Sequence, residues 1–110
     1  MAEKAEIFKG IKLVVIATGL EPETQYYAML VHRETGEYIC TEIVVPDSTG
    51  LAQFVFAYTQ TNNLPEGNVT LQIFDVARND MVGYFKNFGK VIETQLNDDT
   101  DVPSHQADDI

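Results

Sequence analysis

A series of short β-type runs, separated by turn residues, limits the fold of this chain more than any other feature. Residues 11–17 are rich in β-branched side chains, and residues 68–74 alternate apolar Val69, Leu71 and Ile73 with polar neighbours. No stretch carries the i, i+3, i+4 apolar spacing of an amphipathic helix, whereas this alternation is typical of half-buried strands. The sequence therefore predicts an all-β chain.

The turn signals divide the chain into about seven expected strands, which suits a small β-sandwich. With no helix to cross between them, the strands are expected to form antiparallel sheets packed face to face. The last two flank residues 86–88, which predicts a closing hairpin. The expected strands cover residues 11–17, 25–33, 38–45, 51–58, 68–74, 81–85 and 89–95. Alternation predicts one face shared by Ile39, Ile43 and Val45, and another shared by Phe54, Phe56 and Tyr58.

A chain of 110 residues has room for one domain, whose apolar core can hold it together without a metal or a disulfide. The expected organisation is an N-terminal extension over residues 1–9, a β-sandwich over residues 10–95 and an acidic tail over residues 96–110. The tail contains five aspartates and no Lys or Arg, so it holds half of the net charge of −10. With few large apolar groups to bury, it is not expected to fold on its own.

The charge and the N-terminal residues weigh against several classes of partner. A net charge of −10 opposes binding to nucleic acid and to anionic membranes, because both are negatively charged. The N-terminus lacks the apolar run of a signal peptide, and the apolar stretch at residues 13–17 is far too short to cross a bilayer. Cys40 is the one cysteine, so no internal disulfide can form. We therefore expect synthesis in a cytoplasm, no secretion by a signal peptide, no nucleic-acid partner and no membrane insertion.

Two sets of loop residues are more specific than the strand pattern. Residues 19–26 form a G-L-x-P-x-T-x-Y run between two expected strands. In this run Pro22 fixes the turn, and Leu20 and Tyr26 can pack over the end of a sandwich. The Tyr26 hydroxyl can bond to loop backbone, as in a tyrosine corner. The second set runs from Asp47 to Gly50 (D-S-T-G) and from Leu64 to Gly67 (L-P-E-G).

In this order, the motifs resemble those of bacterial and phage immunoglobulin-like domains, over about residues 10–77. The resemblance implies an immunoglobulin-like antiparallel β-sandwich of about seven strands, here with an extended acidic C-terminal tail. Such domains serve in adhesins, in accessory modules of enzymes and on virion surfaces. As a single module without a signal peptide, the chain looks like the small phage proteins that decorate or cement a capsid or tail. The expected function is an accessory virion component, made in the host cytoplasm, whose partners are neighbouring capsid or tail subunits.

Few residues could support catalysis. His32 lies in an expected strand, and no Ser–His–Asp or Cys–His set is evident. Cys40 lacks a cationic or Gly-rich setting that would activate a thiol, so we expect it to act as a small buried apolar residue. The tail aspartates match only fragments of a calcium-binding loop. We expect a protein that is not an enzyme and that uses no cofactor or metal.

The residues expected to contact a partner lie near the last strands and in the tail. Tyr84, Phe85 and Phe88 cluster beside lysines, and a mixed aromatic and basic patch is typical of protein-contact surfaces. The tail could dock on a basic surface of a neighbouring subunit, and the residues expected to do so are Asp98, Asp99 and Asp101. The alternative function is a carbohydrate-binding or adhesion module. That function requires exposed, coplanar aromatic side chains on which sugar rings can stack.

Overall fold

The computed structural model describes residues 5–93, and within that range it contains seven strands and one short helix. Five of the strands, β2 to β6, lie at expected strand positions, whereas β1 and α1 were not predicted. The elements are β1 (Ala5–Phe8), β2 (Leu13–Ala17), β3 (Tyr26–His32), β4 (Tyr38–Cys40), β5 (Ala52–Phe56), α1 (Tyr58–Thr61), β6 (Gly67–Asp75) and β7 (Asp80–Ile92).

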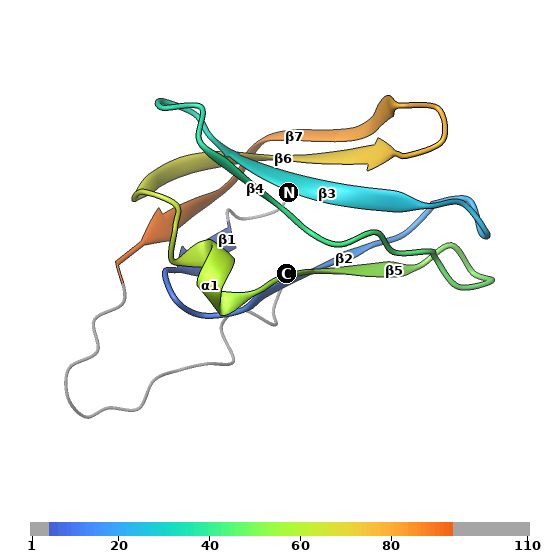
Figure 1. Cartoon of the computed structure of the whole chain (residues 1–110), viewed down its shortest axis with the longest axis horizontal. Coiled ribbons are helices and arrows are strands. Elements are labelled where there is room, and N and C mark those ends of the chain that lie inside the picture. Colours follow the sequence, from blue (N-terminus) through green and yellow to red (C-terminus); the bar gives the residue numbers. More distant parts are fainter. Residues whose placement is uncertain (1–4, 94–110) are drawn as a thin grey trace.

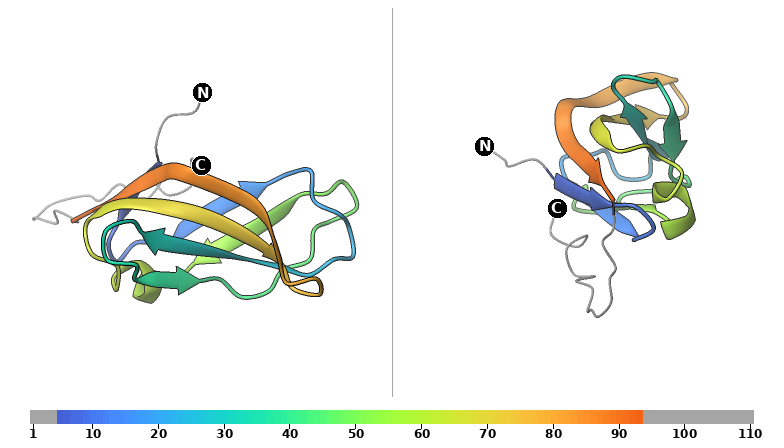
Figure 2. Two further views of the ribbon diagram at one scale, coloured as in Figure 1. Left: turned by 90° about the horizontal axis from the view of Figure 1, so that it is seen from above. Right: turned by 90° about the vertical axis from the view of Figure 1, so that its left-hand side faces the viewer.

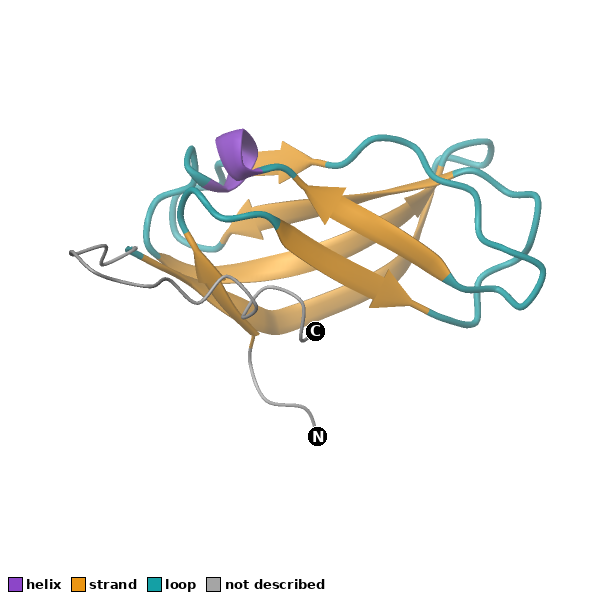
Figure 3. Ribbon diagram, turned by 90° about the horizontal axis from the view of Figure 1, so that it is seen from below, coloured by secondary structure: helices purple, strands orange, loops and turns teal. Residues whose placement is uncertain are grey.

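The strands form two sheets that lie one above the other (Figure 1; Figure 3). The larger sheet has five strands in the order β1-β7-β6-β3-β4, and the smaller sheet pairs β2 with β5. The all-β prediction is confirmed. The prediction of antiparallel pairing throughout is wrong at one place, because β1 pairs with β7 in parallel. These two strands are joined through the rest of the domain rather than by a tight turn, so no hairpin forces them to run in opposite directions.

The core lies between the sheets and is built from alternate residues of each strand. Every second residue of β3 is buried, and Val69, Leu71 and Ile73 of β6 are buried as the alternation predicts. Phe54 and Phe56 of β5 are 0% exposed. Burying one such side chain contributes about 1.5–3 kcal/mol. Tyr58, predicted on the same face as these two, is instead exposed because α1 begins there and ends the strand alternation.

The third expected strand is shorter than its sequence run. β4 ends at Cys40, and Ile43 and Val45 beyond it are about half exposed. The prediction that these two share a face with the buried Ile39 is therefore wrong. The carbonyl of Cys40 accepts a hydrogen bond from the Gln60 side chain of α1, so a side chain satisfies this backbone group.

β7 is one continuous strand, so the closing hairpin predicted at residues 86–88 is wrong. The pairing with β6 shifts between Val69 and Leu71, whose partners in β7 are Gly89 and Phe85. The additional residues of β7 are therefore accommodated within the ladder as a bulge, which bends a strand and increases its twist. Figure 2 shows β7 curling along its length, so that its last residues lie beside β1.

β1 lies inside the segment that was expected to be an N-terminal extension, residues 1–9. It pairs with residues 89–92 of β7, and its Ile7 is 1% exposed within the core. A Cβ atom at Gly89 would lie 2.7 Å from the backbone oxygen of Ala5, so glycine is required for the two strands to approach this closely. Residues 5–8 therefore belong to the folded domain.

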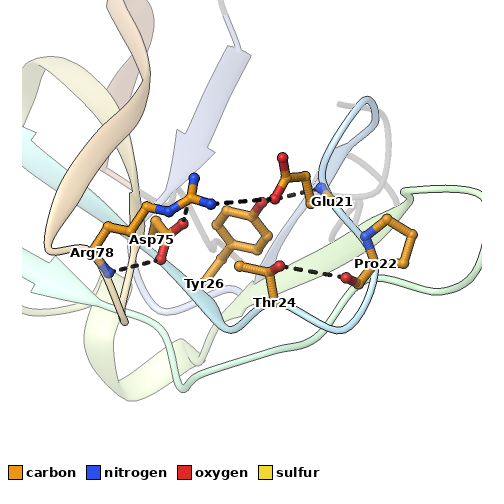
Figure 4. Close-up of polar contacts among 6 residues, drawn as sticks. All are labelled: Glu21, Pro22, Thr24, Tyr26, Asp75 and Arg78. Atoms are coloured by element: carbon orange, nitrogen blue, oxygen red, sulfur yellow. Dashed lines mark hydrogen bonds and ion pairs between the residues drawn. The ribbon is translucent and has the colours of Figure 1, made fainter.

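At one end of the sandwich the first loop motif forms the predicted tyrosine corner (Figure 4). Tyr26 is 3% exposed, and its hydroxyl accepts a hydrogen bond of 3.1 Å from the backbone N–H of Glu21. Asp75, the β6 partner of Tyr26, is buried and accepts a 3.1 Å hydrogen bond from the Arg78 backbone. The Arg78 guanidinium lies 3.9 Å from the Glu21 carboxylate and 3.8 Å from that of Asp75. The network joins the β2–β3 loop to the β6–β7 turn.

The other motif residues also shape this end of the molecule. The Pro22 carbonyl accepts a 3.4 Å hydrogen bond from the Thr24 hydroxyl (Figure 4). Leu20 packs against the core, and its backbone N–H donates to the Gly50 carbonyl at 3.1 Å. A Cβ atom at Gly50 would lie 2.6 Å from the Leu20 carbonyl oxygen. The first motif and the D-S-T-G turn are therefore in direct backbone contact, although the sequence separates them.

Asp47 organises the D-S-T-G turn through its side chain. Its Oδ1 atom accepts hydrogen bonds from the Thr49 hydroxyl at 2.6 Å, the Thr49 N–H at 2.9 Å and the Leu51 N–H at 3.1 Å. The bond from the Thr49 hydroxyl is the largest cause of a lowered Asp47 pKa. The other hydrogen bonds lower this pKa further, because they too favour the charged carboxylate. The ionised carboxylate thus holds the turn in which Gly50 meets Leu20.

Removing the hydroxyl of the tyrosine corner with Tyr26→Phe is expected to lower the free energy of unfolding by about 1–2 kcal/mol, because it leaves the Glu21 N–H without its acceptor. Urea unfolding measures the change. The control is Tyr27→Phe, since Tyr27 is the next residue of β3 and is partly exposed on the opposite face. Its expected effect is below about 0.5 kcal/mol. Equal effects of the two substitutions would contradict a structural role for the corner.

Candidate functional site: the outer face of the large sheet

The face of the five-stranded sheet that points away from the core, here called the outer face, carries apolar and aromatic side chains. In β3 the residues between the buried positions are Tyr27, Met29 and Val31, all of them partly exposed. An antiparallel sheet commonly presents polar side chains on its solvated face. In this sheet the residues that alternate with the core positions are apolar too, so apolar side chains also lie on the outer face.

The strand register brings these side chains together with others from the neighbouring strands. Tyr27 pairs with Phe74 of β6, which pairs with Met81 of β7. The rings of Tyr27 and Phe74 have centroids 5.2 Å apart and are tilted by 31°. In the next row Tyr84 of β7 pairs with Gln72. We call the cluster the outer patch, and its members are Tyr27, Met29, Val31, Tyr38, Cys40, Phe74, Met81 and Tyr84.

Three members of the outer patch are conspicuously exposed. Tyr38 is 62% exposed, Tyr84 is 55% exposed and Met81 is 49% exposed. Single exposed apolar residues are common on proteins, whereas a contiguous group across four strands marks an interaction surface. Aromatic and Met side chains are also the types enriched at such surfaces.

The other end of the outer face is polar and carries positive charge. Lys90 of β7 pairs with Glu6 of β1, and Lys86 is exposed on the same strand. The Arg33 guanidinium donates a 2.9 Å hydrogen bond to the Asn87 side chain. A chain with a net charge of −10 thus places two lysines, Lys86 and Lys90, on the strand that also carries Tyr84. The predicted contact of this region with a partner stays a prediction.

The three aromatic residues predicted to contact a partner do not form one cluster. Tyr84 belongs to the outer patch, whereas Phe85 pairs with the buried Leu71 and faces the other side of the sheet. Phe88 is partly buried and packs against the core. Successive residues of a strand point to opposite faces, so neighbours in sequence are separated by the thickness of the sheet. Phe85 and Phe88 instead line a cavity of about 390 Å³ between β2 and β7.

The predicted contacts in the acidic tail, Asp98, Asp99 and Asp101, lie outside the described residues, as does the whole segment 96–110.

The sequence prediction did not identify most of the outer patch. The sequence predicted only strand positions for Tyr27, Met29 and Phe74, although these residues form the centre of the outer patch. A signal was present, because residues 26–31 are apolar at every position. A strand that is buried on one face only would alternate with polar residues. An unbroken apolar run in an antiparallel strand therefore predicts that both faces are covered.

Neither His32 nor Cys40 has the surroundings of a catalytic group. His32 is 2% exposed, its Nε2 atom lies 2.9 Å from the Glu66 carbonyl, and its Nδ1 atom accepts from the Thr35 N–H at 3.1 Å. Both ring nitrogens therefore hold turns, and His32 is a strand residue as predicted. Cys40 is partly exposed, which corrects the prediction of full burial, and desolvation raises the pKa of its thiol. That shift favours the less nucleophilic thiol form.

Within residues 5–93 no group of three or more His, Cys, Asp or Glu side chains is arranged to hold a metal ion. In the same range no helix has the length and apolar character needed to cross a membrane. Comparison of the chain with models of protein families, with curated proteins and with solved structures gave no match.

Proposed function

We propose that this protein is a non-enzymatic interaction module that binds neighbouring protein subunits of a larger assembly through the outer patch. The observation that carries the proposal is the exposure of Tyr38, Met81 and Tyr84 on the solvated face of an antiparallel sheet. Covering apolar surface contributes about 25 cal/mol per Å² removed from water. Tyr is also among the side-chain types that most often dominate binding energy at protein interfaces.

We further propose that the fold is an immunoglobulin-like sandwich. In such sandwiches the second and fifth strands pair in one sheet, and the third, sixth and seventh strands form the other. The strand orders β2-β5 and β7-β6-β3 support this assignment. The hydrogen bond from the Glu21 N–H to the Tyr26 hydroxyl supports it as well, since a tyrosine corner recurs in these folds.

The assembly that we propose is a phage virion, with this chain as an accessory decoration or cement component of the capsid or tail. Support comes from the resemblance carried by the ordered loop motifs, in which Leu20, Pro22, Tyr26 and Gly50 form one connected corner. A module of this kind acts by surface complementarity, so it requires an exposed contact face and no catalytic group. Under this proposal the protein is made in the host cytoplasm and ends in the virion.

Replacing Tyr84 with serine is expected to reduce incorporation into virions by at least about tenfold, because an interface Tyr at a hot spot contributes about 2 kcal/mol or more. The measurement is the copy number of tagged protein in purified virions, determined by quantitative mass spectrometry. Val55→Ser is the matched control, since Val55 is 43% exposed on β5 of the other sheet. Incorporation of Tyr84→Ser at the level of the control would contradict the role of the outer patch. Absence of the unaltered protein from virions would contradict the virion assignment.

A carbohydrate-binding or adhesion module is the second candidate function, and one observation favours it. The ring pair of Tyr27 and Phe74 lies on an open sheet face, with Tyr84 and the Gln72 amide in the adjacent row. Sugar rings stack on aromatic faces and accept hydrogen bonds from amides. A glycan array probed with the purified protein tests this function, with Tyr84→Ser as the variant expected to lose binding. Absence of any glycan signal would exclude it.

A further inference from the structure

The edge of β7 is only partly covered by its neighbours. β6 pairs along one side of β7, and β1 covers the other side at residues 89–92 only. Within the described part of the chain, residues 80–88 therefore have no strand on that second side. Among the strands of residues 5–93, β2 pairs only with β5, so its other side is also uncovered there. An uncovered strand edge presents backbone N–H and C=O groups that can pair with another strand.

The two uncovered edges border the same cavity. The cavity of about 390 Å³ is lined on one side by β2 residues from Val15 to Ala17 and on the other by Val82, Gly83 and Phe85 of β7. Its floor includes Leu71 and Ile73 of β6, which belong to the core. The cavity is thus an apolar slot between the sheets that opens along two strand edges.

Phe85 shows that this slot is a gap in the side of the sandwich. Its pairing with Leu71, which is 2% exposed, directs it to the core side of the sheet, yet Phe85 is 50% exposed. The next core-side position, Gly83, pairs with Ile73, and the Phe85 ring lies 3.4 Å from the place that a Cβ atom of Gly83 would take. Core-facing positions of a sandwich are normally covered by the opposite sheet. Among residues 5–93, no strand covers this position.

β1 shows what kind of segment fits this edge. It is an extended strand that pairs with the lower part of β7 and inserts Ile7, 1% exposed, between the sheets. The slot lies along the same edge of β7, beside Val82, Gly83 and Phe85. The slot is therefore in line with the position that β1 occupies beside residues 89–92 of β7. β1 therefore shows that an extended strand with an inserted apolar side chain fits this edge of β7.

We propose that this slot accepts one extended strand from another protein subunit, which pairs with the edge of β7 and inserts alternate apolar side chains beside Phe85. Such strand addition obtains affinity from main-chain hydrogen bonds and selects alternate side chains by the pockets beneath them. The site lies on the core side of β7 and is separate from the outer patch, so this proposal and the proposed function can fail independently. A second copy of this chain is disfavoured as the donor, because two molecules that each carry a charge of −10 repel one another.

The test uses the isotope-labelled full chain and a short capped peptide in which Ile or Val alternates with Thr. Binding is expected to slow amide hydrogen exchange by at least about tenfold at residues of β7 between 80 and 88 that do not bond to β6. A second peptide with the same sequence and methylated backbone nitrogens along one edge removes the donors that strand pairing needs. It is expected to bind at least about tenfold more weakly.

Two neighbouring aromatic residues provide the matched variants. Phe85→Ser is expected to weaken peptide binding at least about tenfold, whereas Tyr84→Ser, on the opposite face of the same strand, leaves it unchanged. Equal binding of the methylated peptide would overturn strand addition, as would protection confined to the outer patch or no binding at millimolar peptide. Formation of a dimer through residues 80–88 in analytical ultracentrifugation would also overturn the proposal, because the donor would then be a second copy.

Discussion

Replacing Gly50 with alanine is expected to lower the free energy of unfolding by about 3 kcal/mol. Gly50 has a φ of +86°, which alanine adopts only with strain, and the added Cβ would lie 2.6 Å from the Leu20 carbonyl oxygen. That oxygen belongs to backbone, so it cannot move without disturbing the loop that carries the tyrosine corner. The expected result is therefore a domain that unfolds at clearly lower urea concentration, measured at neutral pH by circular dichroism.

Gly36→Ala separates the two causes of this loss. Gly36 has a φ of +80°, almost the same as Gly50, but no atom lies within 4 Å of the position of its Cβ. Only the conformational strain remains, and the expected loss is about 1 kcal/mol. If both substitutions cost the same, the backbone contact between the two loop motifs would not contribute, and the proposed role of the ordered motifs in shaping this end would be wrong.

Replacing Phe54 with alanine is expected to cost about 3–5 kcal/mol, because Phe54 is 0% exposed at the centre of β5 and its removal leaves a cavity between the sheets. A domain of this size has a total stability of about 5–15 kcal/mol, so the variant would lose a large part of it. Urea unfolding followed by tyrosine fluorescence measures the loss.

The control for this prediction is the next residue along the strand. Val55 is 43% exposed on the opposite face of β5, so Val55→Ala is expected to cost less than about 1 kcal/mol. Similar losses for the two variants would mean that β5 does not present one face to a common core. The comparison therefore tests the packing of the two-stranded sheet against the five-stranded sheet directly.

Much of the fold could be predicted because strand signals are local. Alternation of Val69, Leu71 and Ile73 identified a buried face, and turn residues located most of the strand ends. The hydroxyl of Tyr26 bonds to the loop that precedes it, within the span of one motif, so the corner was also predictable. Local sequence was misleading at residues 86–88, which do not turn the chain back but form a bulge between the pairs Leu71–Phe85 and Val69–Gly89, so that β7 continues.

The candidate site was predictable only in part, because it is assembled from several strands. Of the aromatic residues predicted to contact a partner, Tyr84 lies on the outer face, whereas Phe85 faces the core side. Tyr27 and Phe74, far apart in sequence, become neighbours only through the β3–β6 register. A prediction from a single sequence does not supply that register, since a shift of one residue would place every side chain on the other face.

The sequence by itself determined that the chain is all-β, which residues alternate into the core, and how the loop motif around Tyr26 closes one end. The tertiary structure alone decided that β1 runs parallel to β7, that β7 continues through residues 86–88, and that the aromatic residues divide between the outer patch and the slot beside β2. The physical reason is the range of the interactions. Alternation and turn geometry act over a few residues, whereas the choice of partner strand and register depends on burying the apolar faces of the whole chain at once.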